Sequence, residues 1–371
     1  MAAYKTIGLD GRNYDVEWNG HDLAAEVDYI NLRKTFGEEA VLGILNFVKQ
    51  VTKRKMAVIF GNCQTLVVRN FLRCHKIVQR EYFFLYLPAV CDYHEEFIDQ
   101  LHEGFWSLCD LFIAQRVKKD NAFGEKVGTM QFLNYLPETT KVIWIPNLYY
   151  VGYWPQYIKN ERNVDTHIHS AGRFMNGDRY IDEFMLAHDE VSMAEVEEYI
   201  RGQSFIKEDE VRQWADKSLT SLKEHEWPCD VRMADVVEEY LWDTQLFYAS
   251  NHPVNLLLAE LIRRILDFID VKLNVPIAWG DYDTPRLVGQ DIPIYPKVAE
   301  ILGLQEQIDD YYANNCMWMY HGDWLNFNLE YVKWIWRDKI RGEDIVIIKK
   351  NKGDGLRGKD LPQSGLVWTP C

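Results

Sequence analysis

The chain has 371 residues, of which 47% are hydrophobic and 26% are charged, and these proportions are typical of a globular protein with a large core. Its formal net charge of −15 argues against a general nucleic-acid-binding surface, so an anionic ligand must be met by a local cluster of Arg and Lys. The seven scattered cysteines form no C-x-x-C motif, so we expect no disulfide framework. The sequence has no apolar segment typical of a signal peptide and no run approaching the about 20 apolar residues of a membrane span. We therefore expect a cytoplasmic protein.

The first 52 residues are expected to form an extension that precedes the core. Residues Tyr14–Trp18 alternate between polar and apolar side chains, which predicts a short strand. The segment Leu23–Val51 predicts one or two helices, with a break at Phe36-Gly37.

Residues 53–160 have the pattern of an α/β core. Apolar runs with the length of buried strands alternate with segments long enough for crossover helices, which predicts a parallel sheet covered on both faces. The expected strands are Met56–Phe60, Tyr82–Leu87, Leu111–Ala114 and Val142–Ile145. The expected helices are Gln64–Cys74, His94–Trp106 and Val127–Leu136.

In such sheets ligands bind beyond the carboxyl ends of the strands. The run Gly61-Asn62-Cys63-Gln64 follows the first strand and places a cysteine where a helix begins. Helix N-termini favour the nucleophilic thiolate and can bind an oxyanion, although a small buried cysteine is an equally good local interpretation. Gln115-Arg116 and Pro146-Asn147 end two further strands and are candidates for the same site.

An aromatic loop, Leu148–Tyr157, follows the last of these strands. Its rings either pack on the edge of the sheet or stack on a sugar or a base. The pair His167 and His169 is weak evidence for a metal without a nearby carboxylate, so we expect no metal site.

Residues 161–230 are expected to form a helical insertion or lid, or a contact between copies in a homo-oligomer. Ser192 and Glu195 match the capping box of a helix that runs to about Arg201, and Lys207–His225 predicts a second helix.

Residues 231–275 return to the core with the motif Asn251-His252-Pro253 and an amphipathic helix over residues 254–269. Pro253 suits the first helical position, with Asn251 or His252 as the cap. The helix dipole disfavours a charged histidine there, and neutral imidazole is the form that acts as a general base. A histidine satisfied by a local backbone hydrogen bond is the alternative.

These motifs, in this order, resemble the WcbI-type capsular polysaccharide biosynthesis family over roughly residues 56–270. The residues that carry the resemblance are Gly61-Asn62-Cys63-Gln64, Gln115, Pro146-Asn147-Leu148, Gly152-Tyr153, Pro155 and Asn251-His252-Pro253. The resemblance implies an α/β core that is SGNH- or flavodoxin-like at its start and has additional helical segments. It also implies coenzyme A binding and O-acetyl transfer to a sugar or surface polysaccharide. Residues 1–52 and the C-terminal extension, 276–371, have no counterpart in it.

We therefore expect acetyl-CoA as the co-substrate, a sugar or polysaccharide acceptor, and Cys63 and His252 as the catalytic pair. Cys63 either carries the acetyl group or lines the pocket for the CoA sulfur. The expected oxyanion- and substrate-binding residues are Gly61, Asn62, Gln64, Gln115, Asn147 and Asn251. The expected cofactor-binding residues are Arg69, Arg116, Lys118, Tyr153 and Arg173. The alternatives are a thiol-dependent or SGNH-like esterase acting on acylated glycans, and a non-catalytic glycan-assembly protein.

Overall fold

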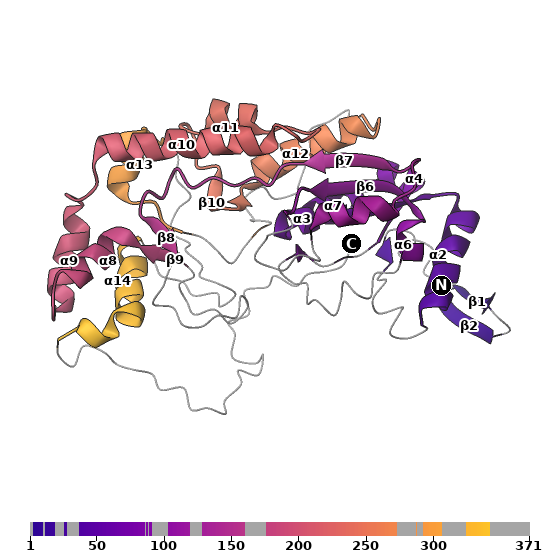
Figure 1. The fold of residues 1–371 in the computed structure, drawn as a ribbon, viewed down its shortest axis with the longest axis horizontal. Helices are drawn as coiled ribbons and strands as arrows, with labels where there is room; N and C mark the ends of the chain where they lie inside the picture. Colours follow the sequence, from indigo (N-terminus) through magenta and orange to yellow (C-terminus); the bar gives the residue numbers. More distant parts are fainter. Residues whose placement is uncertain are drawn as a thin grey trace.

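A parallel β-sheet forms the core of one half of the protein, on the right in Figure 1. The computed structural model describes residues 3–9, 12–18, 26–27, 37–85, 87, 89–90, 103–118, 128–159, 176–272, 287, 292–305 and 324–341. The five-stranded sheet has the order β3-β5-β4-β6-β7, and every neighbouring pair is parallel. Its strands are β3 (Glu26–Val27), β4 (Lys55–Phe60), β5 (Tyr82–Leu85), β6 (Cys109–Gln115) and β7 (Lys141–Ile145). The strands expected from the sequence at β4 to β7 are confirmed.

The sheet is buried on both faces because its strands are apolar at successive positions. Side chains alternate across a strand, so Met56 and Val58 of β4 lie in one hydrophobic cluster and Ala57 and Ile59 lie in another. Helix α2 (Glu38–Thr52) packs in the first cluster; α3 (Cys63–Cys74) and α12 (Asn255–Phe268) pack in the second. The expected α/β fold with helices on both faces is confirmed.

The chain leaves β4 toward β5 on one side and later returns to β6 on the other side. The strand order therefore reverses between β4 and β6, and the space beyond the carboxyl ends of these two strands is where ligands bind in open α/β sheets. Cys63 begins the helix that follows β4, and Gln115 is the last residue of β6.

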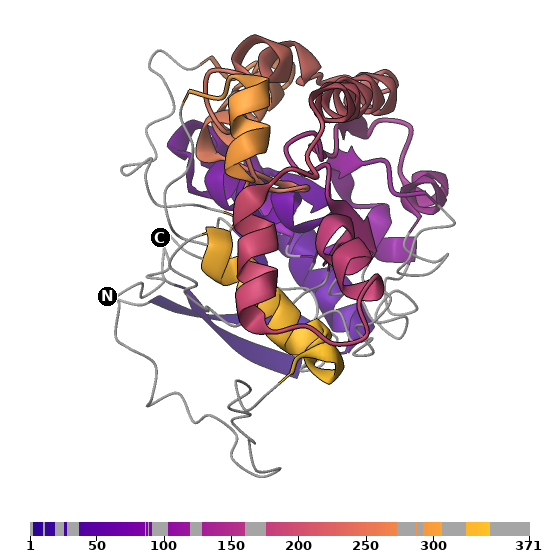
Figure 2. The same ribbon diagram turned by 90° about the vertical axis from the view of Figure 1, so that its left-hand side faces the viewer.

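A layer of helices extends the core beyond the sheet (Figures 1 and 2). It consists of α8 (Arg179–Leu186), α9 (Met193–Gly202), α10 (Glu208–Glu226), α11 (Ala234–Tyr240), α13 (Pro296–Leu302) and α14 (Trp324–Ile335). Helix α9 begins with the predicted capping box of Ser192 and Glu195, and the expected helix over Lys207–His225 is α10. These helices share one hydrophobic cluster with the strands, so the described helices of the expected insertion and of the C-terminal extension pack against the same core as the sheet.

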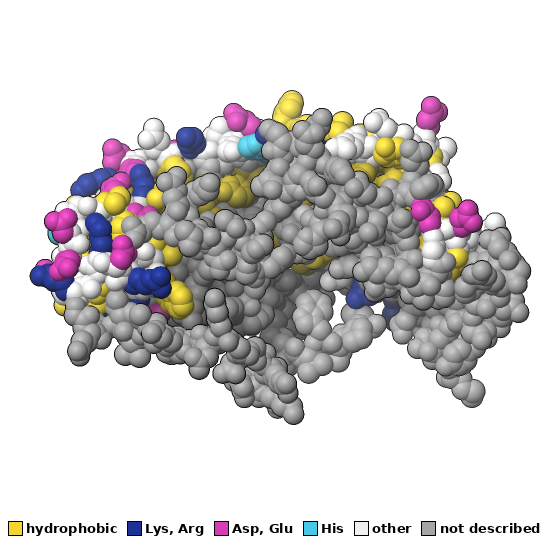
Figure 3. Space-filling view, turned by 60° about the horizontal axis from the view of Figure 1, so that its bottom comes forward, with side chains coloured by type: hydrophobic (Ala, Val, Ile, Leu, Met, Phe, Trp, Pro, Cys, Tyr) yellow, Lys and Arg dark blue, Asp and Glu magenta, His cyan; other side chains and the backbone are white. Residues whose placement is uncertain are grey.

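Charged side chains of both signs are interspersed over the end of the molecule that carries α8, α9 and α14 (Figure 3). Arg201 pairs with Glu197 on α9, and Arg341 pairs with Glu195. Because the charges on this face are mixed, it offers no single-sign surface for a charged polymer.

The remaining described elements are short. They are β1 (Ala3–Leu9), β2 (Arg12–Trp18), β8 (Tyr157–Lys159), β9 (Asn176–Asp178), β10 (Phe247–Ala249), β11 (His252–Pro253), α4 (Lys76–Glu81), α6 (Glu103–Trp106), α7 (Thr129–Phe132), η3 (Leu133–Tyr135) and η4 (Arg337–Lys339). The expected strand Tyr14–Trp18 is part of β2, which pairs with β1 in an antiparallel hairpin. No helix in the described ranges is long and apolar enough to cross a membrane.

Three sequence expectations differ from the structure. Glu26 and Val27 form an edge strand rather than helix, because they pair with β5. The helix expected over Val127–Leu136 is a single turn, α7, followed by η3, and only α6 of the expected helix His94–Trp106 lies within the described residues. Pro253 is not the first helical residue, because β11 pairs with β10 and α12 begins at Asn255.

Candidate active site

Cys63 and His252 meet beyond the carboxyl end of β4. The Sγ atom of Cys63 lies 3.7 Å from Nε2 of His252, although the two residues are 189 positions apart in the sequence. Cys63 is half-buried, and only 6% of His252 is exposed. A thiol and an imidazole in contact are the minimum set for an activated sulfur nucleophile.

The turn before α3 positions the cysteine. Asn62 is the N-cap, and its Oδ1 accepts a hydrogen bond from the backbone N–H of Gln64. Gly61 leaves room for the neighbouring side chains, since a Cβ atom at this position would lie 2.4 Å from Oε1 of Gln115 and 2.6 Å from Cγ2 of Thr65. Gly61 was expected among the oxyanion- and substrate-binding residues. In the structure its contribution is steric, because it allows Gln115 to approach the turn.

Gln64 is fully buried, and its amide joins three segments of the site. Its Nε2 donates to the carbonyl oxygens of Leu148 at 2.8 Å and Asn251 at 2.7 Å, and its Oε1 accepts from the N–H of Leu148 at 3.1 Å. The Nε2 of Gln115 donates to the same Oε1 at 3.2 Å. Both ends of the Gln64 amide are thus used within the protein, which corrects the expectation that this side chain binds an oxyanion.

Gln115 is also buried and also acts within the protein. Its Oε1 accepts the backbone N–H of Asn62 at 2.8 Å, and its Nε2 also donates to the carbonyl of Pro146 at 3.2 Å. The expectation that Gln115 contacts substrate is corrected in the same way: this side chain holds the turn before Cys63 against the end of β7.

Two asparagines lie closer to the open side of the site. The Nδ2 of Asn62 donates to Oδ1 of Asn147 at 2.8 Å, and Asn147 is exposed. Because the oxygen of Asn147 accepts this bond, its own Nδ2 group is left for a ligand. Asn251 contributes its carbonyl to Gln64 rather than a side-chain contact.

His252 is held neutral by burial. Desolvation disfavours the imidazolium and lowers the pKa of His252 to about 4. Within the described residues its Nδ1 has no hydrogen-bond partner. The helix dipole expected to keep this histidine neutral does not act on it, because His252 lies in β11 and not in the first turn of α12, so the cause is desolvation.

Several expected cofactor ligands lie elsewhere. Tyr153 is fully buried, and its hydroxyl donates to the carbonyl of Leu241 at 2.9 Å, so it presents no surface to a cofactor. Arg69 is buried and donates to the carbonyl of Leu87 at 3.1 Å, which makes it part of the interior. Lys118 is exposed. Arg173, like His167 and His169, lies outside the described residues.

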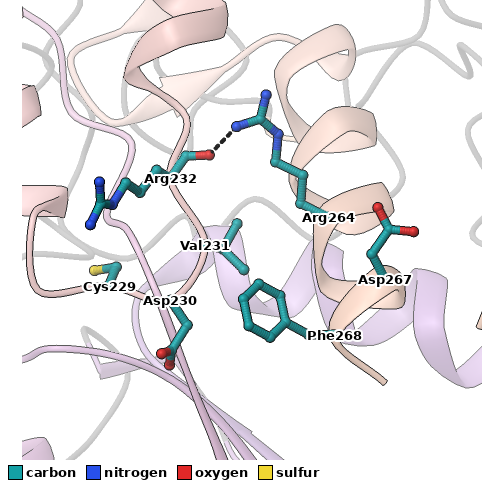
Figure 4. Close-up of a pocket in the computed structure, with 7 residues that line it drawn as sticks. All are labelled: Cys229, Asp230, Val231, Arg232, Arg264, Asp267 and Phe268. Carbon is teal, nitrogen blue, oxygen red and sulfur yellow. Dashed lines mark hydrogen bonds between the residues drawn. The ribbon is translucent and has the colours of Figure 1, made fainter. Parts of the chain in front are cut away.

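Arg116 is exposed and belongs to a cluster that the sequence did not indicate. Its guanidinium lies 5.4 Å from the ring centroid of Trp144, and Arg232 lies 4.6 Å from that of Trp227. Nη1 of Arg116 donates to the carbonyl of Pro228, directly before Cys229, at 3.5 Å, and the side chain of Arg232 lies beside Cys229 (Figure 4). Burial raises the pKa of the Cys229 thiol to about 11. Neither arginine forms an ion pair with another described residue.

This arginine cluster borders an open pocket of about 580 Å³, lined by Cys229, Asp230, Val231, Arg232, Arg264, Asp267 and Phe268 (Figure 4). The guanidinium of Arg264 is hydrogen-bonded within the protein, since it donates to the carbonyl of Arg232 at 2.6 Å and to Asp235 at 2.8 Å. Asp230 is also hydrogen-bonded within the protein, because its Oδ2 accepts the N–H of Trp144 at 2.7 Å on the outer edge of β7. Arg232 points toward Cys229 and remains the lining cation that is open to a ligand.

Two comparisons with known proteins agree with each other. The family model described as "Polysaccharide biosynthesis enzyme WcbI" matches residues 56–274. A solved structure of WcbI, "a novel polysaccharide biosynthesis enzyme", in its native form without a disulfide bond between coenzyme A and a cysteine, superposes with a TM-score of 0.62. It is 19% identical in sequence, and the match covers 76% of this chain and 90% of that one. A comparison with curated protein sequences gave no match. Because the family model covers more than half of the sequence and both residues of the Cys63–His252 pair, this chain belongs to the WcbI family of polysaccharide biosynthesis enzymes.

Proposed function

We propose that this protein is a CoA-dependent O-acetyltransferase that moves acetyl from acetyl-CoA to a hydroxyl of a sugar or surface polysaccharide. The observation that carries this proposal is the 3.7 Å contact between the Cys63 thiol, at the start of α3, and the neutral imidazole of His252. The family to which the chain belongs supports a saccharide acceptor, and the coenzyme A named with the solved relative supports the donor.

Acetyl-CoA would supply an acetyl group already activated as a thioester. Nε2 of His252 takes the proton from the Cys63 thiol, and the thiolate attacks the acetyl carbonyl. As acetyl-Cys63 forms, the C–S bond to CoA breaks and the proton on His252 passes to the departing CoA sulfur. His252 then takes the proton of the acceptor hydroxyl, whose oxygen attacks acetyl-Cys63. The O-acetyl product leaves, and the proton returns to Cys63.

Each attack places negative charge on the carbonyl oxygen. The Nδ2 group of Asn62 donates one hydrogen to Asn147 and has a second N–H for this oxygen. The Nδ2 group of Asn147 is the next donor on the open side. A well-placed donor of this kind contributes about 3 to 4 kcal/mol to transition-state stabilisation.

The phosphates of CoA need cations, and Arg116 and Arg232 suit them. Both guanidinium groups lack an ion-pair partner among the described residues, and both lie near Cys229 beyond the edge strand β7. Trp227, which is 71% exposed, offers the second face of its ring to the adenine while Arg232 covers the first. Arg116 directly follows Gln115, so a pantetheine arm can run from this cluster along the ends of the strands to Cys63.

Two measurements test the proposal. Acetyl-CoA should raise the melting temperature of the protein, because a ligand that binds only the folded state stabilises it. Incubation with acetyl-CoA should then yield protein whose mass has increased by one acetyl group on Cys63. Absence of any stabilisation would contradict a CoA-dependent transferase. An acetylated protein that transfers its acetyl group only to water would favour the esterase alternative, which uses the same residues.

A further inference from the structure

Tyr149 lies on the open rim of the site and takes no part in the chemistry described so far. It follows Asn147 by two positions in the extended segment that leaves β7. Exposure alternates along this segment, since Asn147 and Tyr149 are exposed while Leu148 and Tyr150 are fully buried. Residues two apart in an extended chain point to the same side. The ring of Tyr149 therefore shares the open side with Asn147, whose Oδ1 contacts Asn62 beside Cys63.

The backbone on either side of Tyr149 is fixed. The N–H and carbonyl of Leu148 both bond to the amide of Gln64, and the N–H of Tyr150 donates to the carbonyl of Ser250 at 2.7 Å. The hydroxyl of Tyr149 lies near the side chain of Ser250, two residues before His252. Because the backbone of both neighbouring residues is hydrogen-bonded, Tyr149 presents its exposed ring from a fixed position beside the reacting groups.

Resting on the proposed function, we propose that Tyr149 is the platform on which a pyranose ring of the acceptor stacks, next to Cys63 and His252. The apolar C–H face of a pyranose complements the electron-rich face of a tyrosine ring.

The adenine of CoA is not the group that Tyr149 binds. When the CoA sulfur is at Cys63, the whole pantetheine arm separates the adenine from the reacting centre. A ring that adjoins Asn147 and the segment of His252 is within reach of the acceptor hydroxyl, which has to come to the same carbonyl. The position of Tyr149 thus favours contact with the acceptor sugar and not with the adenine of CoA.

The test compares Tyr149→Ala, Tyr149→Phe and the control Tyr135→Ala. Tyr135 in η3 is 44% exposed and Tyr149 is 42% exposed, so the control removes a ring of similar exposure away from the site. The assay follows CoA release from acetyl-CoA, with and without methyl α-D-mannopyranoside and methyl β-D-galactopyranoside as acceptor probes. Saturation-transfer NMR measures binding of the same two glycosides directly, without acetyl-CoA.

We expect Tyr149→Ala to raise the KM for the glycoside about two- to tenfold, the effect of one lost aromatic contact, while kcat changes little. CoA release without glycoside should stay at the wild-type rate. Tyr149→Phe keeps the ring and should keep the wild-type KM, and Tyr135→Ala should behave as the wild type.

An unchanged KM for the glycoside in Tyr149→Ala would overturn the platform proposal. Glycoside NMR signals that are equal in the wild type and Tyr149→Ala, or that are absent from the wild type, would overturn it as well. A failure of the proposed function gives a different result. If the protein is not an acetyltransferase, the wild type would neither bind nor turn over acetyl-CoA. Loss of the glycoside NMR signal in Tyr149→Ala would still support a sugar platform at this site.

Discussion

The side chain of Gln64 joins the two halves of the site, because its Nε2 donates to the carbonyl of Asn251 across 2.7 Å. Gln64 is the second residue of α3, directly after Cys63, and Asn251 directly precedes His252. One partly buried hydrogen bond therefore ties the backbone that carries the thiol to the backbone that carries the imidazole.

Replacing Gln64 with Leu should destabilise the protein. The substitution leaves the carbonyl and the N–H of the buried Leu148, and the partly buried carbonyl of Asn251, without their partner. Each orphaned buried group costs about 1 to 3 kcal/mol. We expect the free energy of unfolding to fall by about 3 kcal/mol or more in chemical denaturation. Gln213→Leu, on the exposed side of α10, is the control and should change it by less than about 0.5 kcal/mol. Wild-type stability combined with lost activity would instead show that Gln64 acts on the substrate.

Removing either reacting side chain should strongly slow acetyl transfer. His252→Ala should slow CoA release about 10²- to 10⁴-fold, the usual contribution of a general base, and Cys63→Ala should slow it at least as much. His225→Ala, at an exposed position on α10, should retain the wild-type rate. If Cys63→Ala keeps the wild-type rate, the acetyl group passes directly from CoA to the acceptor, and Cys63 only borders the CoA sulfur.

The activity should persist to low pH. Burial lowers the pKa of His252 to about 4, so the imidazole remains a competent base well below the usual value for histidine of about 6.5. The acid limb of the pH profile of kcat/KM for acetyl-CoA should therefore lie near pH 4. An acid limb near 6.5 would show that His252 is solvated in the working enzyme.

The same histidine should make the folded state less stable as the pH falls from about 6.5 to about 4. In this window the unfolded chain binds a proton that the folded protein does not bind, so stability is complete above the unfolded pKa and declines by at most about 1.4 kcal/mol per pH unit. Burial raises the pKa of Asp178 to about 7. The contribution of Asp178 to the stability of the folded state therefore changes in the opposite direction: it is present at low pH and is lost as the pH rises. The free energy of unfolding is measured by denaturation across this pH range for the wild type and His252→Asn. The difference between the two proteins gives the contribution of the histidine, because Asp178 is present in both. Parallel curves for the two proteins would contradict this prediction.

Gly61→Ala should impair the site more than the fold. The added Cβ would lie 2.4 Å from Oε1 of Gln115 and would push this side chain off the N–H of Asn62, which sets the turn before Cys63. We expect the rate of CoA release to fall at least about tenfold, since a small displacement of a catalytic group is costly. Gly202→Ala, where a new Cβ meets nothing within 4 Å, is the matched control and should keep full activity.

Neutralising Arg116 or Arg232 should weaken acetyl-CoA binding. Each substitution to Gln removes a charge-assisted hydrogen bond to phosphate, so the KM for acetyl-CoA should rise about tenfold or more. The KM for acetyl-pantetheine, which has no phosphate, should stay unchanged. Arg212→Gln on α10, an exposed arginine paired with Glu208, controls for the loss of surface charge. Equal effects on both donors would show that the arginines do not bind the phosphates.

Local patterns in the sequence were enough for the elements of the core. Continuous apolar runs identify β4 to β7, the capping box identifies the start of α9, and the strand–turn–helix motif identifies the position of Cys63. These features depend on neighbours in the chain, so their physical cause is visible in the sequence.

Long-range contacts decided the rest. Pro253 belongs to β11 because β10 pairs with it, and β3 is a strand because β5 is beside it. The sequence left open whether the rings of the aromatic loop pack on the sheet or stack on a ligand. In the structure Tyr153 is buried and Tyr149 is exposed, because the fold covers only some of the side chains along this loop.

By itself the sequence determined the family resemblance, the parallel-sheet core, and the two residues that meet at the site. Only the tertiary structure decided that Cys63 and His252 touch, because 189 residues separate them and the contact depends on buried hydrogen bonds from Gln64 to distant backbone. It also decided that Gln64 and Gln115 position the site, that Arg232 joins Arg116, and that desolvation keeps His252 neutral. Burial and hydrogen bonding between distant segments are properties of the packed chain, and no local pattern of residues encodes them.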